Sequence, residues 1–524
     1  METVEMKQVE GGVCAARGFS ANGLNCGLNP DKNKNDLALI YSERDCKAAA
    51  VYTTNKVKGA PILVTKKNLA ASGNIARAVI ANSKNANTCN ADGEEKAARM
   101  CELAAKELGI NANEVIVAST GVIGQILPIE PIESHITELA KGLAPENHGK
   151  AANAIMTTDT IKKEVAVTFE LGGKKCTVGG MAKGSGMIHP NMATTLNFVT
   201  SDVAISAELI QKALSDIVKV TYNCLSIDGD TSTNDMVCIL ANGMAENAEI
   251  ATENDDYEIF RQALYQVLMS LTKMLAKDGE GASKMIECTC AGAPDQDTAI
   301  IVAKSVIRSP LFKCAMFGED ANWGRILCAI GYAEADFDID KVAVDIASAK
   351  GTIAVCRNGA GVEFSEDEAK VVLGEDEIYI NIDLGQGDAS AKAWGCDLTY
   401  DYDEQRLIDQ VVNARKNGKQ HYIIINAEGI GHSQSMAKRI EEATGIETRA
   451  TILGHMQRGG SPTCKDRVYA TTMGALAVDL LCEGKTNRVI AHKNGEFVDF
   501  DIDEALAMKK GVDEYMYQIS KSLV

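Results

Sequence analysis

Patterns typical of helices and of strands alternate along almost the whole chain. Apolar residues recur at helical spacing in some segments and alternate with polar residues in others, with Gly or Gly-Gly between them. Such a chain must pack helices against sheets, so we expect an α/β or α+β class. The expected elements are a helix over 93–108 ended by Gly109, a strand over 115–118, hairpin strands over 164–171 and 174–178, a helix behind Ser206 and a helix over 257–277.

Length and charge narrow the class of protein further. The 524 residues suggest about three domains of about 150 residues each. The formal net charge of -19 argues against a nucleic-acid partner or an anionic membrane surface. Residues 1–12 contain no apolar signal stretch, and no run approaches the ~20 apolar residues of a membrane span. We expect a cytoplasmic protein without a nucleic-acid or membrane partner.

The 16 cysteines point to the same compartment. They are scattered singly, without CxxC spacing, so reduced thiols are expected rather than a zinc site or a disulfide framework. The one close pair, Cys288 and Cys290, is spaced to lie on one face of a strand.

The segment 179–198 is the most unusual part of the sequence. Four glycines fall within residues 179–186, Pro190 follows, and residues 195–200 alternate like a strand. A small residue before a Thr at the start of a strand suits self-cleavage, in which the Thr194 hydroxyl attacks the carbonyl of Ala193. An N-to-O shift gives an ester, water opens it, and the new amine of Thr194 can act as base for its own hydroxyl. From the residues alone, an ordinary turn followed by a strand is the stronger interpretation, and the spacing of a phosphate-binding loop is absent.

Residues 181–194 resemble the cleavage region of the ornithine acetyltransferase family. This family is also called glutamate N-acetyltransferase, and some members are bifunctional with N-acetylglutamate synthase. Further segments resemble its signatures and occur in its order, namely 118–124, 156–160, 228–235, 278–284, 317–325 and 393–400. The resemblance covers residues from about 10 to about 402. It implies a two-domain, self-processing fold with an N-terminal threonine nucleophile, cut between Ala193 and Thr194.

The resemblance also implies roles for single residues. Thr194 resembles the nucleophile, and Thr120 and Gly121 resemble the oxyanion hole, where a hydroxyl and a backbone N–H at a strand end are suitable donors. The substrate-binding residues that it implies are Thr157, Lys183, Thr194 and Glu280. Of these, Lys183 suits an amino-acid carboxylate and Glu280 suits an ammonium group.

Structural interpretations of the same residues stay open at this stage. Thr157 alone would be a cap or turn residue, and Glu280 a solvated residue after a helix. Asp228, Asp230 and Asp235 have the spacing of a cation-binding loop, but the resemblance implies no metal, so we interpret them as turn and cap residues.

The activity implied is ping-pong transfer of the acetyl group of N2-acetyl-L-ornithine to L-glutamate through acetyl-Thr194, in arginine biosynthesis. No cofactor is expected, although acetyl-CoA is a further possible acetyl donor. The expected partners are small amino-acid substrates and further copies of the chain, with cleaved α and β chains in a heterotetramer. Two alternatives remain, an N-terminal-nucleophile hydrolase or aminopeptidase, and an inactive fusion.

Residues from about 404 to 524 resemble a different family, the ATP-dependent 6-phosphofructokinases. The resemblance rests on residues 447–463, and sugar-phosphate contacts are implied for Glu428, Arg449, His455 and Arg458. No segment resembles the nucleotide-phosphate loop or the catalytic Asp of those kinases, so kinase activity is not expected. The alternative fusion is one whose C-terminal piece only binds a sugar phosphate.

Three parts of the chain follow from these two resemblances. They are an acetyltransferase α chain over 1–193, a β chain over 194–402 and a phosphofructokinase-like fragment over 403–524. The acetyltransferase family runs a little past this junction, and its last residues include an Asn and a Thr that close the substrate pocket. Neither has a recognisable counterpart after Tyr402.

Overall fold

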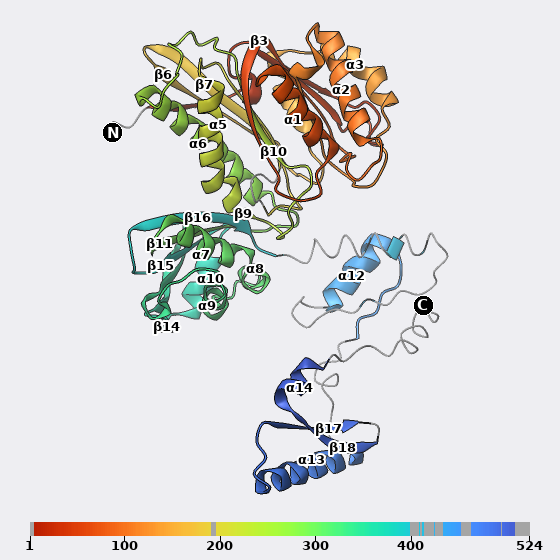
Figure 1. The fold of residues 1–524 in the computed structure, drawn as a ribbon, viewed down its shortest axis with the longest axis vertical. Coiled ribbons are helices and arrows are strands. Elements are labelled where there is room, and N and C mark those ends of the chain that lie inside the picture. The colour runs from red at the N-terminus through yellow and green to blue at the C-terminus, as the bar shows by residue number, and fades with distance from the viewer. Residues whose placement is uncertain are drawn as a thin grey trace. The chain divides into compact units, whose positions relative to one another are not determined.

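The computed structural model describes residues 5–189, 195–398, 408, 411–412, 415, 424, 433–451, 463–493 and 495–508. It divides into two compact units, Met1–Thr399 and Tyr400–Val524. Helices and strands are mixed throughout, which confirms the expected α/β class (Figure 1). Among the described residues, no helix combines the length and apolar content needed to cross a membrane.

The larger sheet of the first unit has nine strands, in the order β1-β6-β7-β8-β10-β3-β4-β5, with β2 paired to β3. Its strands are β1 (Lys7–Val9), β2 (Phe19–Leu24), β3 (Leu37–Tyr52), β4 (Ile75–Asn82), β5 (Val115–Ser119), β6 (Lys163–Leu171), β7 (Lys174–Lys183), β8 (Leu196–Ser201) and β10 (Met236–Ala241). The smaller sheet has the order β14-β13-β12-β15-β11-β16-β9. Its strands are β14 (Ala360–Gly361), β13 (Gly351–Arg357), β12 (Ala343–Ser348), β15 (Glu377–Asp383), β11 (Met285–Ala293), β16 (Ala389–Cys396) and β9 (Leu225–Ser226).

Ten α-helices and five short 3-10 helices complete the described part of the first unit. The α-helices are α1 (Ala60–Ser72), α2 (Gly93–Leu108), α3 (Glu130–Lys141), α4 (His148–Ala154), α5 (Ala207–Val220), α6 (Asp255–Lys277), α7 (Gln296–Arg308), α8 (Pro310–Phe317), α9 (Trp323–Gly331) and α10 (Glu366–Leu373). The 3-10 helices are η1 (Gly12–Cys14), η2 (Ala112–Glu114), η3 (Pro145–Asn147), η4 (Tyr222–Cys224) and η5 (Ile339–Lys341).

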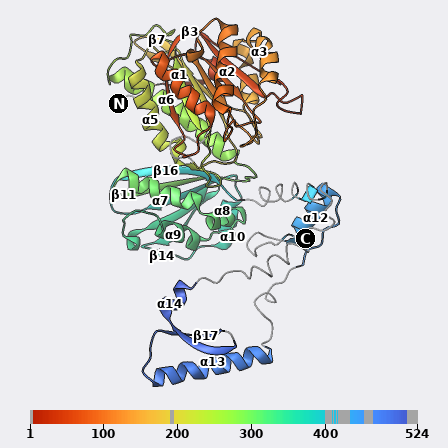
Figure 2. The same cartoon turned by 45° about the vertical axis from the view of Figure 1, so that its right-hand side comes forward.

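Three hydrophobic clusters show how the large sheet is layered. The first lies between β6, β7, β8 and β10 and the helices α5 and α6, and it continues into the smaller sheet. The second is lined by the other face of β7, β8 and β10, by one face of β3, β4 and β5, and by α4. The third lies between the opposite face of β3, β4 and β5 and the helices α1, α2 and α3. The two halves of one sheet therefore enclose the second cluster, with helices outside both halves (Figures 1 and 2).

Strand β3 joins the two halves of the large sheet. It is 16 residues long, pairs with β4 through its first part and with β10 through its second part, and is drawn as a long curved ribbon in Figure 1. The register between β3 and β4 shifts between Tyr41 and Cys46. Such an irregularity bends a strand, which lets β3 turn from one half of the sheet into the other.

Several predicted elements have the expected bounds. Helix α2 covers 93–108, and its C-cap Gly109 has a φ of 68°, a left-handed conformation that favours glycine. The hairpin is formed by β6 and β7, and the side chain of Ser206 caps α5 by accepting a hydrogen bond from the N–H of Leu209. The thiols of Cys288 and Cys290 both lie in the first cluster, on one face of β11, as their spacing predicts.

Strand β7 is longer than its sequence predicts. We expected it to end at Val178, but it continues to Lys183 through Gly179 and Gly180. A Cβ on Gly179 would lie 2.0 Å from the carbonyl oxygen of Gly12. The glycine is therefore required by the close passage of another backbone, and it does not end the strand.

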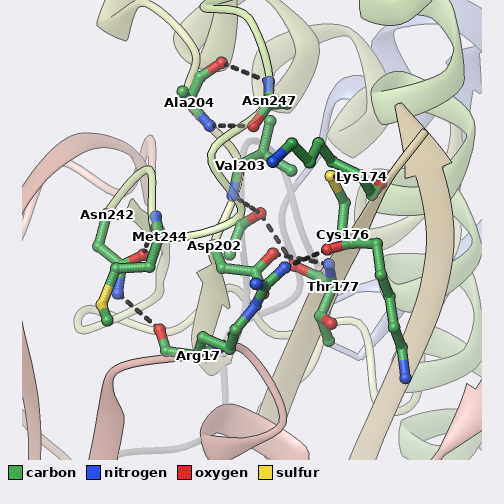
Figure 3. Close-up of polar contacts among 12 residues, drawn as sticks. Arg17, Lys174, Cys176, Thr177, Asp202, Val203, Ala204, Asn242, Met244 and Asn247 are labelled. Carbon is green, nitrogen blue, oxygen red and sulfur yellow. Dashed lines mark hydrogen bonds and ion pairs between the residues drawn. The ribbon is translucent and has the colours of Figure 1, made fainter. Parts of the chain in front are cut away.

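A polar cluster fixes the N-terminal segment at the end of β8 that points away from Thr195 (Figure 3). The buried carboxylate of Asp202 accepts hydrogen bonds from the backbone N–H of Thr177 at 2.7 Å and from Nε of Arg17 at 3.2 Å. Nδ2 of Asn242 donates to the carbonyl oxygen of Arg17 at 2.8 Å. Nearby, Asn247 bonds the backbone of Ala204 through both side-chain atoms.

The second unit is described in separate pieces. Its elements are α12 (Ser433–Thr444), α13 (Cys464–Cys482), β17 (Arg488–Lys493), β18 (Glu496–Asp501) and α14 (Ile502–Ala507). The side chains of Thr463 and Asp466 form a capping box at the start of α13, and β17 and β18 form an antiparallel pair. Tyr469, His492 and Phe497 pack their rings together.

Gly179→Ala should lower the stability of the first unit by about 1–3 kcal/mol, because the new methyl group would overlap the backbone of Gly12. Thermal and denaturant unfolding of the purified protein measure this loss. Gly331→Ala is the matched control, because nothing lies within 4 Å of a Cβ at that position. Equal stability of the two variants would contradict the proposed packing at β7.

Candidate functional site

Thr120 and Gly121 follow directly after β5, as the predicted oxyanion donors should. The N–H of Thr120 donates to the carbonyl oxygen of Asn82 at 2.9 Å, which continues the pairing beyond the strand. Gly121 has a φ of 134°, and a Cβ there would lie 2.1 Å from the carbonyl carbon of Lys84. No described residue accepts a hydrogen bond from the Thr120 hydroxyl or from the N–H of Gly121. Two unused donors therefore stand side by side at the end of a strand.

The glycine-rich segment leads from β7 toward Thr195. Lys183 is the last residue of β7, and a Cβ on Gly184 would lie 2.6 Å from Cγ2 of Thr195. The carbonyl oxygen of buried Thr195 accepts a hydrogen bond from the N–H of Met236 at 2.9 Å. The predicted cleavage residues Ala193 and Thr194 lie outside the described residues, so the nucleophile and the cut remain predictions.

Asp159 connects the predicted substrate-binding segments. Its carboxylate accepts hydrogen bonds from the N–H of Thr157 at 3.1 Å and from the N–H of Gly184 at 2.7 Å. It also pairs with Nζ of Lys163 at 2.7 Å, and Nζ lies 2.5 Å from the carboxylate of Asp278, the C-cap of α6. All three charged side chains are almost completely buried. The cluster thus binds the Thr157 segment, the end of β7 and the end of α6 together.

Charge pairing decides the protonation of Asp159. Burial favours its neutral form, but Lys183, Lys163 and the N–H of Gly184 together outweigh burial, so the pKa of Asp159 lies below its ordinary value of 3.8. The carboxylate is therefore ionised at neutral pH.

Lys183 is the predicted partner of a substrate carboxylate. Its ammonium group has no hydrogen bond or ion pair with any described residue, although Asp159, Asp235 and Glu280 are near enough to interact with it electrostatically. Burial lowers the pKa of Lys183, and these carboxyl groups oppose that change. The ammonium therefore retains donors for a ligand.

Glu280 lies beside the glycine-rich segment. Its backbone N–H donates to the carbonyl oxygen of Ser185 at 2.9 Å, and a Cβ on Gly186 would lie 2.2 Å from Oε2 of Glu280. Burial raises the pKa of Glu280, and the nearby carboxylate of Asp228 adds to the rise. The contact with Gly186 shows that Glu280 is packed against the site and is not a fully solvated residue.

Asp228 holds the glycine-rich segment in place. Its carboxylate accepts hydrogen bonds from the N–H groups of Met187, Ile188 and Asp230, the last two at 2.9 and 3.0 Å. This is a turn-stabilising role, as interpreted from the sequence.

His189 follows Ile188 in the same segment, and its Nδ1 lies 3.0 Å from the hydroxyl oxygen of Ser226. Burial, with Lys304 and Arg308 nearby, lowers the pKa of His189 to about 4, so its ring is neutral at cellular pH.

Asp235 is more buried than its interpretation as a turn residue predicts. It lies directly before β10, is 3% exposed, and its Oδ2 has no hydrogen-bond partner in the described structure. Burial raises the pKa of Asp235 well above its ordinary value, against the attraction of Lys183. Burial therefore disfavours the ionised form of this carboxyl group.

Of the predicted site residues that the structure describes, Thr157, Lys183 and Glu280 lie around the segment that follows β7. Asp159 links Thr157 to the backbone beside Lys183, and Glu280 packs against the same segment. No role for Asp159, Lys163 or Asn234 follows from the sequence alone. Asp159 and Asn234 did fall within the segments that resemble family signatures, but nothing in the sequence indicates which residues bond to one another.

The predicted sugar-phosphate site is not assembled among the described residues. Glu428, His455 and Arg458 lie outside them. Arg449 is described, and its exposed guanidinium pairs with the neighbouring Glu447 at 2.6 Å. The sugar-phosphate role of these four residues stays a prediction.

Comparisons with known proteins give two family matches. Residues 20–405 match a model described as the ArgJ family, and residues 393–481 match a model described as Phosphofructokinase. The Arginine biosynthesis bifunctional protein ArgJ 1 of Clostridium acetobutylicum is 50% identical over 385 residues, which are 73% of this chain and 94% of that protein. The ArgJ protein of Caldanaerobacter subterraneus subsp. tengcongensis is 47% identical over 398 residues, covering 76% of this chain and 98% of its own.

A solved structure is also similar in sequence. Ornithine acetyltransferase from Mycobacterium tuberculosis, complexed with ornithine, is 36% identical and covers 36% of this chain and 100% of its own, with a TM-score of 0.33.

Lys163→Met should destabilise the protein by about 3–5 kcal/mol at pH 7, because the buried carboxylates of Asp159 and Asp278 would lose the ammonium group that they share. The folded-state pKa of Asp159 is lowered, so its stabilising contribution is complete above about pH 4 and is lost as the pH falls further. The difference between wild type and variant should therefore shrink in acid, as the carboxylates protonate. Denaturant unfolding at several pH values measures it.

Lys212→Met is the control for this substitution. Lys212 also pairs with a carboxylate, that of Glu253, but both side chains are about half exposed. Its loss should cost far less than that of Lys163, because solvent screens a half-exposed ion pair. A similar loss for both variants would show that burial of the Lys163 cluster adds nothing.

Proposed function

Because the chain belongs to the ArgJ family across residues 20–405, we propose that it transfers the acetyl group of N2-acetyl-L-ornithine to L-glutamate. The family match confirms the resemblance expected from the sequence. The chain is therefore an enzyme of the bifunctional arginine-biosynthesis type, and it also carries a phosphofructokinase-like segment at 393–481. The finer assignment, to one reaction and its residues, is our proposal.

One observation carries that proposal. Two unused donors, Thr120 and Gly121, and an ammonium group without a partner among the described residues, Lys183, lie at the end of the sheet where the chain enters β8 at Thr195. Acyl transfer needs these parts, since an oxyanion must be stabilised and a charged substrate must be held in register with the nucleophile.

The first step that we propose is self-cleavage. The Thr194 hydroxyl attacks the carbonyl carbon of Ala193, the C–N bond of the peptide breaks, and an ester links the two residues. Water then hydrolyses the ester, which leaves a carboxylate on Ala193 and a free amine on Thr194. An α-amine titrates near pH 8, so a useful fraction is neutral and can accept the proton of the Thr194 hydroxyl.

Acetyl transfer then uses the same hydroxyl twice. Thr194 attacks the acetyl carbonyl of N2-acetylornithine, and the Thr120 hydroxyl and Gly121 N–H stabilise the oxyanion that forms. The C–N bond breaks, ornithine leaves with the proton held by the Thr194 amine, and an acetyl ester remains. The amine of glutamate attacks this ester, and N-acetylglutamate leaves. One amide replaces another, so no cofactor is required.

The charged residues suit the two ends of the donor. Lys183 has donors for the α-carboxylate, and Glu280 suits the side-chain ammonium of N2-acetylornithine. Burial raises the pKa of Glu280, and a bound ammonium would favour its ionised form and offset that effect. Thr157, which Asp159 holds through its backbone, is proposed as a further substrate contact.

We extend the proposal to acetyl-CoA as a second donor, because the relatives are named bifunctional. The proposed assembly is a heterotetramer of cleaved α and β chains in the cytoplasm. An N-terminal-nucleophile hydrolase is the competing function, and acceptor dependence separates the two. Without glutamate, a transferase releases about one ornithine per site and then stops, whereas a hydrolase continues to release ornithine at the same rate.

Denaturing mass spectrometry should find two fragments that meet between Ala193 and Thr194, because the free amine of Thr194 is needed for catalysis. Thr194→Ala should remain one chain and lose acetyl transfer entirely. Thr195→Ala, at the neighbouring position, should still be cut at the same bond. A wild-type chain that stays whole after long incubation at neutral pH would contradict the proposed function.

The sequence after Tyr402 should weaken donor binding. It stands where the acetyltransferase family has the residues that close the substrate pocket. A buried substrate charge that lacks its partner costs about 1–3 kcal/mol. Exchange of residues 403–524 for a family-type tail should lower KM for N2-acetylornithine about fivefold or more, with cleavage unchanged.

An assay for kinase activity tests the interpretation of residues 403–524 separately. The chain with ATP and fructose 6-phosphate should form no fructose bisphosphate. An unchanged KM in the tail exchange would show that the missing contacts are unimportant, and phosphorylation would overturn the interpretation of residues 403–524 as a fragment.

A further inference from the structure

We propose that Asn234 is a positioning residue, which holds the donors Thr120 and Gly121 at the correct distance from the strand that follows Thr194. This inference rests on the proposed acetyl-transfer function. Asn234 itself makes no contact with a reacting group, and it acts through the backbone of Ser119, the residue before Thr120.

The side chain of Asn234 uses its full hydrogen-bonding capacity. Nδ2 donates to the carbonyl oxygen of Ser119 at 2.9 Å and to that of Ala86 at 2.5 Å. Oδ1 accepts from the hydroxyls of Thr88 and Thr233, both at 2.6 Å. A primary amide has two N–H donors and two acceptor sites, so all four are occupied.

The surroundings of Asn234 leave room for no other orientation. The residue is 6% exposed, and a Cβ on Gly59 would lie 2.7 Å from its side chain. The two carbonyl oxygens of Ser119 and Ala86 can only accept, so they require the NH2 group on their side. The position of the Asn234 side-chain amide and the direction of its NH2 group are therefore both fixed.

Strand pairing alone would keep these groups far apart. Ser119 of β5 pairs with Asn82 of β4, and Asn82 pairs with Leu37, the first residue of β3. Met236, two residues after Asn234, lies opposite Tyr52, the last residue of β3. A straight strand between these ends of β3 would span about 50 Å. The bend in β3 brings the two ends together, and the Asn234 amide bonds them directly.

A second asparagine supports the other side of the donors. Oδ1 of Asn82 accepts from the Ser119 hydroxyl at 2.6 Å, and its backbone carbonyl accepts from the N–H of Thr120 at 2.9 Å. Asn82 belongs to β4, beside β5, so it orients the donors within their own half of the sheet. Asn234 belongs to the other half, in the segment that leads into β10 beside β8. Only Asn234, of these two, relates the donors to the Thr194 side.

Asn234→Asp tests this role. The substitution keeps the size of the side chain, but it replaces both donors by an oxygen that faces two carbonyl oxygens. A displacement of about 1 Å at the oxyanion donors can lower a rate by about 100-fold. We expect kcat per cleaved enzyme and the rate of self-cleavage to fall together, by about 10-fold to 100-fold, with KM for N2-acetylornithine within about twofold of wild type.

Asn247→Asp is the matched control. Asn247 is also buried, and its Nδ2 donates to two backbone carbonyl oxygens, those of Ala204 and Ala248, at 3.1 and 2.8 Å. It lies beside Ala204 in the loop after β10 (Figure 3), whereas Asn234 lies before β10. Asn247→Asp should lower the melting temperature yet leave kcat and self-cleavage unchanged.

A double-mutant cycle separates positioning from general destabilisation. If Asn234 acts through the oxyanion donors, Asn234→Asp should add little to the loss caused by Thr120→Ala. Multiplicative losses, or equal losses of kcat in the Asn234 and Asn247 variants, would overturn the proposal.

Thr88→Val covers the case in which Asn234→Asp does not fold. It removes one hydrogen bond to Oδ1 of Asn234 with almost no change of volume. It should lower kcat by a smaller factor without changing KM, and an unchanged kcat would contradict the inference. These outcomes are distinct from failure of the proposed function, in which wild type itself would neither be cut nor transfer acetyl groups.

Discussion

The bend of β3 is the constraint on which the rest of the first unit depends. Because one strand pairs with both halves of the large sheet, its course decides which strand ends meet. The second hydrophobic cluster fills the space between the halves, so burial of its apolar residues favours the bent form. The end of β5 and the entry to β10 then meet at one edge, where a single amide joins them. The bend of β3 thus determines both the packing of the second cluster and the geometry of the site.

Buried charge is arranged unequally around this edge. Lys163 is neutralised by two carboxylates that also hold backbone N–H groups, so it contributes rigidity and offers nothing to a ligand. Only more distant carboxyl groups surround Lys183. Burial raises the pKa of Glu280 and of Asp235, which favours the neutral form of each. A zwitterionic ligand would restore balance by bringing one charge of each sign. This distribution of charge supports the amino-acid substrates that we propose.

Local sequence patterns predicted local structure well. The bounds of α2, the cap of α5 and the β6–β7 hairpin depend on residues close in sequence, and each was expected. The continuation of β7 past Val178 was not, because the cause is the backbone of Gly12, which is 167 residues away in the sequence. Thr120 and Gly121 were proposed as oxyanion donors from the resemblance. Asn234 and Asp159, in contrast, make long-range contacts that no sequence spacing indicates.

The pairing of β7 with β8 has a consequence for the protein after the proposed cut. The two strands are antiparallel neighbours, with Lys183 opposite Leu196, and they would belong to different polypeptides. The same holds for β3 and β10, and the second cluster would be shared between the fragments. Neither fragment would retain the whole large sheet. Unfolding of the mature enzyme would then release two molecules from one, so its melting temperature would rise with protein concentration, as for an obligate dimer.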